Sequence, residues 1–293
     1  MNSTAESIVS RLGGDWHGQR GLAPCPLCQQ SGRKDQRALS VRQGDAGGIL
    51  LHCFKCKAPF KDLATALDIP KAQRAKPDEI KRAGAKDERE RKNRAAKLWL
   101  DPLCRPIKGT FAERYLRKRG ITLEIPDNTA RFHPRAFHMT RTHLPCLLWR
   151  ATDATGAGTG VQRVYLTPDG NKTDRNPQKA HLGSFTGSAV RFGDPAATEC
   201  VVGEGCETTL AAMQLAGVPA GFAALSTSGM TAWEPPKHIR QVTLLADLDE
   251  SRAGEIACRK TAERLRGLGL GVTIVQPKAG GDFCDELMWV GDE

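Results

Sequence analysis

Three short apolar runs in the last third of the chain, two of them ending at an acidic residue, restrict the fold more than any other feature. The runs occupy residues 199–203, 241–246 and 271–275. Glu204 follows the first run and Asp247 follows the second. Short, continuously apolar runs are typical of strands buried on both faces of a parallel sheet, and helical patterns alternate with them here. We therefore expect an α/β region with a mostly parallel sheet.

The acidic residues at the ends of these runs predict a metal site. Because the carboxyl ends of parallel strands meet at one edge of a sheet, Glu204, Asp247 and Asp249 are expected at the same rim. Carboxylates that lie close together repel one another unless a cation lies between them, and oxygen ligands select Mg²⁺ or Mn²⁺. The alternative is that each acidic residue only caps the helix that follows its strand.

The order of these motifs resembles the Toprim domain of bacterial and phage DNA primases, topoisomerases and some nucleases. A Glu-Gly pair at 204–205 and an Asp-x-Asp motif at 247–249 match its two acidic motifs. The segment 280–286 is similar to the acidic stretch that closes this domain in primases. The resemblance implies metal-dependent catalysis, with Mg²⁺ or Mn²⁺ on the first three of five residues: Glu204, Asp247, Asp249, Asp282 and Asp285.

The first acidic motif departs from the pattern of bacterial primases at one position. Where an aspartate often stands four residues after the glutamate, this chain has Thr208, and Glu207 lies one position earlier. Glu207 either takes over the role of that aspartate or only stabilises the N-terminus of its helix.

Four of the ten cysteines form two Cys-x-x-Cys motifs that are separated by 24 residues: Cys25, Cys28, Cys53 and Cys56. Two such motifs can close a tetrahedral shell around Zn²⁺, and the strand patterns between them predict a zinc ribbon within residues 1–70. A disulfide framework, the alternative, is typical of small secreted domains. The segment 25–67 resembles the N-terminal zinc-binding domain of phage and plasmid primases, which implies that the ribbon helps to read a template.

Charge is distributed unevenly along the chain. Residues 1–195 hold 35 Lys and Arg against 19 Asp and Glu, whereas residues 196–293 hold 8 against 14. The basic part is expected to attract a polyanion such as single-stranded DNA, and the acidic part divalent cations. Residues 71–97 have little apolar surface to bury and are expected to be a charged linker that becomes helical from about Asp87. The alternative is a solvated basic helix without a partner.

Residues 98–195 are expected to form a basic α+β subdomain. A helical pattern at 110–119 precedes alternating strand patterns at 143–192. This part resembles the subdomain before Toprim in primases, in which an arginine in a strand and a lysine beyond the next turn contact nucleotide phosphates and template. The residues that match are Arg163, Lys179 and, less closely, Lys172. The alternative for each is a solvated strand face.

With residues 196–293 as the Toprim catalytic domain, the whole order resembles a phage or plasmid primase without a helicase. The resemblance implies a DNA-directed RNA polymerase that joins ribonucleoside triphosphates into short primers on single-stranded DNA, with one structural Zn²⁺ and a separate replicative helicase. A Toprim nuclease and a non-catalytic zinc-ribbon protein that binds single-stranded DNA stay open as alternatives. Without a long apolar run or a secretory signal, a cytoplasmic protein encoded by a bacterium, phage or plasmid is expected, with no membrane partner.

Overall fold

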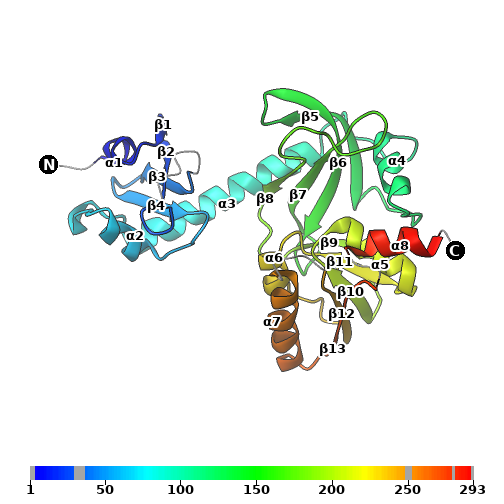
Figure 1. Cartoon of the computed structure of the whole chain (residues 1–293). Coiled ribbons are helices and arrows are strands. Elements are labelled where there is room, and N and C mark those ends of the chain that lie inside the picture. Colours follow the sequence, from blue (N-terminus) through cyan, green and yellow to red (C-terminus); the bar gives the residue numbers. More distant parts are fainter. Residues whose placement is uncertain (1–3, 30–36, 248–252, 279–280, 292–293) are drawn as a thin grey trace. The chain divides into compact units, whose positions relative to one another are not determined.

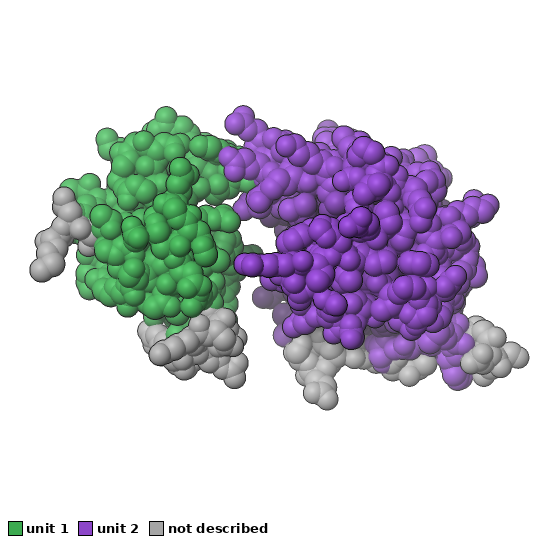
Figure 2. Space-filling model, turned by 90° about the horizontal axis from the view of Figure 1, so that it is seen from above, with its two compact units in different colours: residues 1–87 green, residues 88–293 purple. Residues whose placement is uncertain are grey.

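The computed structural model describes residues 4–29, 37–247, 253–278 and 281–291. The chain divides into two compact units, residues 1–87 and 88–293, which Figure 2 shows in different colours. The boundary falls within helix α3 (Pro77–Trp99). No helix among the described residues is long and apolar enough to cross a membrane.

The first unit is built on a four-stranded antiparallel sheet (Figure 1). Its elements are α1 (Ala5–Arg11), β1 (Asp15–His17), β2 (Arg20–Ala23), β3 (Leu39–Gln43), β4 (Ile49–Cys53), α2 (Phe60–Ala66) and η1 (Lys71–Gln73). The strands pair in chain order. Gly21 has no side chain, which allows Val9 of α1 to pack directly on β2. The small β domain expected at the N-terminus is therefore present.

Helix α3 begins at Pro77, earlier than the start near Asp87 that the sequence suggests. Proline suits the first turn of a helix, and the acidic residues that follow it are stabilised by the helix dipole. Glu79 is buried and accepts a hydrogen bond from the backbone N–H of Ala46 at 3.0 Å. Arg42 donates to Asp87 at 2.8 Å. Residues 71–87 of the expected linker therefore belong to the first unit.

The second unit contains a nine-stranded mixed sheet. Its strands are β5 (Ala130–His138), β6 (Thr142–Thr152), β7 (Gly158–Tyr165), β8 (Lys179–Gly183), β9 (Ala189–Gly193), β10 (Glu199–Gly203), β11 (Ala220–Ala223), β12 (Gln241–Leu245) and β13 (Gly271–Val275). Their order is β13-β12-β10-β11-β9-β6-β7-β8, with β5 paired to β6. Strands β13, β12, β10 and β11 pair in parallel, which confirms the expected α/β sheet.

Helices cover both faces of this sheet (Figure 1). They are α4 (Phe111–Lys118), α5 (Cys206–Ala216), α6 (Thr227–Ala232), α7 (Ala253–Gly267) and α8 (Phe283–Gly291). Helices α4, α5 and α8 share a core with one face, around Leu147 and Trp149. Helices α6 and α7 pack on the other face of the parallel part, around Trp233 and Leu244. The end of α3 packs on that second face nearer to β7.

Strand β9 joins the parallel strands to the antiparallel ones. It pairs antiparallel with both β11 and β6, so residues before and after 195 belong to one hydrogen-bonded sheet. At its end Gly193 has a φ of +76°, and a Cβ there would collide with the carbonyl oxygen of Pro219. The sheet is therefore continuous across the domain boundary that was expected between residues 195 and 196.

Candidate functional site

Two carboxylates lie at neighbouring strand ends in the parallel part of the sheet. Val202 of β10 is opposite Leu244 of β12, so Glu204 and Asp247 emerge just beyond the carboxyl ends of adjacent strands. Both residues are half-buried. Burial, together with the charges of Asp247 and Glu204, raises the pKa of the Cys258 thiol to about 12. The structure therefore brings these two predicted site residues together.

The remaining predicted carboxylates have other surroundings. Asp249 lies outside the described residues. Asp282 caps α8, since its Oδ1 accepts from the N–H groups of Cys284 and Asp285 at 2.8 and 3.1 Å. Its Oδ2 pairs with Arg119 at 2.8 Å, and Asp285 accepts from the N–H of Asp282 at 3.1 Å. Both residues stabilise the start of α8 in this structure, and their metal role stays a prediction.

Glu207, in the first turn of α5, forms a buried ion pair with Lys179 of β8. Glu207 is only 4% exposed, and its Oε2 lies 3.1 Å from the Lys179 amine. Its Oε1 accepts a hydrogen bond from the Tyr115 hydroxyl at 2.8 Å. Burial alone would raise the pKa of Glu207, but the charge of Lys179 and the hydrogen bonds lower it to about 2. Glu207 is therefore ionised, with both oxygens engaged inside the protein.

Two further cations lie near this pair. The Lys172 amine is 6.0 Å from the centre of the Tyr115 ring, and burial and the charge of Lys179 lower the pKa of Lys172. Arg119, just beyond α4, is engaged with Asp282. With Glu207 and Lys179, these residues form a group of three cations and two carboxylates, the Lys172 cluster, whose five side chains have a net charge of +1 (Lys172, Lys179, Arg119, Glu207 and Asp282).

Arg163 lies on the opposite face of the sheet from Lys179. In the β7–β8 pair, Val164 is opposite Lys179 and Ala180 is opposite Arg163. Successive side chains of a strand point to opposite faces. The Arg163 guanidinium donates to the carbonyl of Phe137 at 3.3 Å. The two residues therefore do not share one surface in this structure, and the binding of nucleotide or template by each stays a prediction.

The two Cys-x-x-Cys motifs meet in the first unit. All four Sγ atoms lie within 4.8 Å of one another, with 3.9 Å between Cys25 and Cys56 and 3.6 Å between Cys28 and Cys53. Tetrahedral Zn²⁺ with Zn–S bonds of about 2.3 Å requires sulfur pairs about 3.8 Å apart. Burial raises the pKa of Cys25 and, to about 12, that of Cys28, whereas burial at Cys53 is outweighed by backbone N–H groups at Cys56 and Lys55, which lower its pKa to about 7, so it is the geometry of the sulfur atoms that indicates a metal site. The four cysteines could therefore hold one Zn²⁺.

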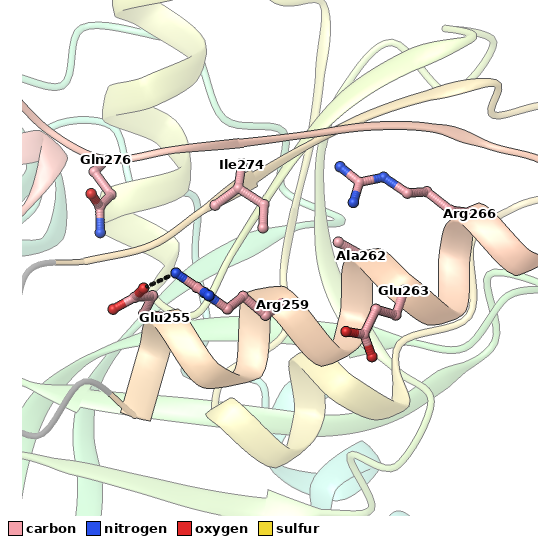
Figure 3. A pocket seen from close by; sticks show the side chains of 7 residues that line it. All are labelled: Glu255, Arg259, Ala262, Glu263, Arg266, Ile274 and Gln276. Carbon is pink, nitrogen blue, oxygen red and sulfur yellow. Dashed lines mark hydrogen bonds and ion pairs between the residues drawn. The ribbon is translucent and has the colours of Figure 1, made fainter.

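A recess of about 430 Å³ lies between α7 and the edge strand β13 (Figure 3). Glu255 and Arg259 line it and pair with each other at 2.7 Å. Arg266, which also lines it, donates to the carbonyl of Val272 at 2.8 Å. Because both arginines are engaged, an anionic ligand would gain less here than beside Lys172.

Comparisons with known proteins match two segments of the chain to family models. A family model described as Toprim domain matches residues 199–293. The C-terminal region is a Toprim domain. A second model, described as Domain of unknown function (DUF7146), matches residues 89–192. The chain is similar to the crystal structure of the primase fragment of bacteriophage T7 primase-helicase protein, at 14% identity and a TM-score of 0.40, over 89% of this chain and 93% of that chain. No curated protein was found to match.

The Toprim resemblance predicted from the acidic motifs is confirmed by the family match. Toprim domains bind Mg²⁺, and the rim of this Toprim domain has donors that suit it. Glu204 and Asp247 present carboxylate oxygens from neighbouring strand ends, and Mg²⁺ is bound through one or two carboxylates together with water and substrate phosphates. The donor set therefore fits a Mg²⁺ or Mn²⁺ ion.

The ion pair of Glu207 was not foreseen from the sequence. Glu207 was expected either to take over the role of the aspartate in the bacterial pattern or to stabilise the N-terminus of its helix, whereas in the structure it binds Lys179 and Tyr115. One signal could have found it. Glu207 is the only charged residue in 206–213, a segment that is buried throughout. A single charge in a buried helix turn requires a partner.

Proposed function

We propose that the chain is a DNA primase, which joins ribonucleoside triphosphates into short RNA primers on a single-stranded DNA template. The observation that carries this proposal is the pair of Glu204 and Asp247 at neighbouring strand ends of a Toprim domain. The cysteine cluster and the excess of basic residues in 1–195 support it, because a template has to be bound as well as copied.

The acidic residues supply the proposed catalytic site. Glu204, Asp247 and Asp249 are the proposed ligands of Mg²⁺ or Mn²⁺, and Asp282 and Asp285 are proposed to complete the site. The metal, when bound, would neutralise triphosphate charge and lower the pKa of the primer 3′-hydroxyl. Glu204 is also a candidate general base for that hydroxyl. Most of the rate enhancement would come from positioning and charge neutralisation.

The basic residues and the zinc ribbon supply the proposed binding surfaces. Of the three basic residues that the sequence singled out, Lys172 and, on the opposite face of the sheet, Arg163 are proposed to act on phosphates of the nucleotide or the template, whereas Lys179 is engaged by Glu207. The four clustered cysteines are proposed to hold one structural Zn²⁺, with the ribbon contributing to template recognition. A separate replicative helicase is the proposed partner, and the cytoplasm is the proposed location.

The proposal is tested by primer synthesis from labelled ribonucleotides on a bare single-stranded template. Glu204→Gln and Asp247→Asn should each lower primer yield by roughly 100-fold or more, the scale of one lost electrostatic contact in the transition state. Melting temperature and template binding should stay near those of the unchanged protein. Glu199→Gln is the matched control, because Glu199 is exposed at the opposite end of strand β10.

The outcomes separate this function from its rivals. If the two carboxylates were only helix caps, the same variants would lower the melting temperature and leave primer yield near normal. A Toprim nuclease would cleave the template in a metal-dependent way without needing ribonucleotides. A non-catalytic single-strand-binding protein would bind the template and yield neither primers nor cleavage products.

A further inference from the structure

The buried ion pair gives the two lysines of this region different roles, and this conclusion rests on the proposed function. We infer that Glu207 and Tyr115 are positioning residues that hold Lys179 in an internal ion pair, and that Lys172 supplies the one uncompensated charge for a phosphate. The phosphate belongs to the nucleoside triphosphate or to the template strand.

Lys179 is already bound within the protein. Its amine lies 3.1 Å from Oε2 of Glu207, and the other oxygen of Glu207 is held at 2.8 Å by the Tyr115 hydroxyl. Glu207 cannot leave this pair cheaply, because it is buried and would lose its counter-charge. A lysine whose charge is balanced in this way attracts a phosphate less strongly than a lysine without an ion-pair partner does.

Lys172 is in the opposite situation. It is half-buried next to the Tyr115 ring, and no ion pair formed by the described residues includes it. The neighbouring Arg119 is balanced by Asp282 at 2.8 Å, so Lys172 carries the excess charge of the cluster. Its backbone forms an isolated antiparallel bridge with Leu166, which fixes the position from which its side chain starts.

The charges around Lys172 favour a bound anion. Burial is the main cause that lowers the pKa of Lys172; Lys179 and Arg119 lower it further by repelling the ammonium group, while Glu207 and Asp282 oppose them. A phosphate that binds Lys172 relieves this repulsion and keeps the ammonium form. A charge-assisted contact of this type is among the stronger hydrogen bonds in proteins.

The test measures anion binding by the full-length protein, with ATP, inorganic tripolyphosphate and a labelled single-stranded oligonucleotide as separate probes. The variants are Lys172→Met, Lys172→Arg, Glu207→Gln and the double change Lys179→Met with Glu207→Gln. Arg175→Met is the control, because Arg175 is an exposed cation of the same connection between β7 and β8. Oligonucleotide binding is repeated over a series of salt concentrations, and melting temperature is recorded for every variant.

Lys172→Met should weaken binding about 10-fold. For the oligonucleotide, the slope of log K against log salt concentration should become shallower by about 0.7, the value for one lost phosphate contact on a single strand. Lys172→Arg should restore most of the affinity. The double variant should bind within about 3-fold of the unchanged protein, because it removes no net charge. Glu207→Gln frees the Lys179 amine, so the same slope should become steeper by about 0.7. A purely structural role of Glu207 would leave the slope unchanged.

Two results would overturn the inference. One is a double variant that binds as weakly as Lys172→Met, which would mean that Lys179 contacts the phosphate itself. The other is an unchanged protein that binds none of the three probes. If the expected binding pattern appears but the protein makes no primers, the proposed function fails and the assignment of the lysines stands. Loss of ATP and tripolyphosphate binding at Lys172→Met identifies the nucleotide as the source of the phosphate, and loss confined to the oligonucleotide identifies the template.

Discussion

Replacing Lys179 by methionine should destabilise the second unit, although a lysine on a solvated strand would be replaceable at almost no cost. The pKa of Glu207 is held at about 2 rather than at 4.5, which corresponds to about 3 kcal/mol in favour of the buried carboxylate. Lys179 is the main attractive partner, but its side chain is 34% exposed and solvent screens part of the interaction. We therefore expect Lys179→Met to lower the free energy of unfolding by about 2 kcal/mol.

The measurement is urea unfolding at pH 7, followed by tryptophan fluorescence. Four of the five tryptophans lie in the second unit, so the signal reports mainly on the part of the chain that contains the pair. Arg175→Met should change the free energy by less than about 0.5 kcal/mol. The double change Lys179→Met with Glu207→Gln should recover most of the loss, because no buried charge is left unpaired. If Lys179→Met matched the Arg175 control, or if the double change recovered nothing, the ion pair would not stabilise the fold as described.

Three further expectations concern other parts of the chain or other conditions. Removing metal with a chelator should release about one Zn²⁺ per chain and unfold the first unit, while the second unit keeps its melting temperature. Cys28→Ser should also lose the metal and unfold the first unit, whereas Cys104→Ser should do neither, as elemental analysis and calorimetry can check. Because its pKa is depressed in the folded state, Glu207 contributes fully to the free energy of unfolding above pH 4.5, its unfolded pKa, and loses this contribution as the pH falls towards 2. In urea titrations between these pH values, acid should therefore destabilise the unchanged protein more than Glu207→Gln. Gly193→Ala should lower the free energy of unfolding by about 2–4 kcal/mol, because the new Cβ collides with the Pro219 carbonyl and the positive φ is unfavourable for alanine. Gly156 has a similar φ but open space around it, so Gly156→Ala should lower the free energy of unfolding by only about 1 kcal/mol in the same assay.

The sequence predicted the parallel part of the fold well because its signals are local. Strands β10 and β13 have the bounds that their apolar runs indicated, residues 199–203 and 271–275. The short helix α6 was missed, since Thr227–Ala232 has no amphipathic repeat and is held by the Ser226 cap. The pairing of β9 with β11 was also missed, because hydrogen bonds between distant strands leave no periodic pattern in either strand.

The candidate site was predictable to a similar degree. Glu204 and Asp247 could be placed together because each directly follows a buried strand, and parallel strands end at one edge. The separation of Arg163 and Lys179 onto opposite faces could not be foreseen. It depends on the register of β7 with β8, and the connection between these strands is too long to fix that register.

Strand β9 also decides how the second unit can move and how it can be divided. Because β9 is bonded to both β6 and β11, the distance from the Lys172 cluster to the carboxylate rim is held by one sheet rather than by a hinge. A closure around a substrate within the second unit would therefore have to come from its loops. Cutting the chain near residue 195 would also leave β9 and β11 with unpaired edges, which are templates for aggregation. The two family matches at 89–192 and 199–293 therefore describe segments that we expect to unfold together as one cooperative body.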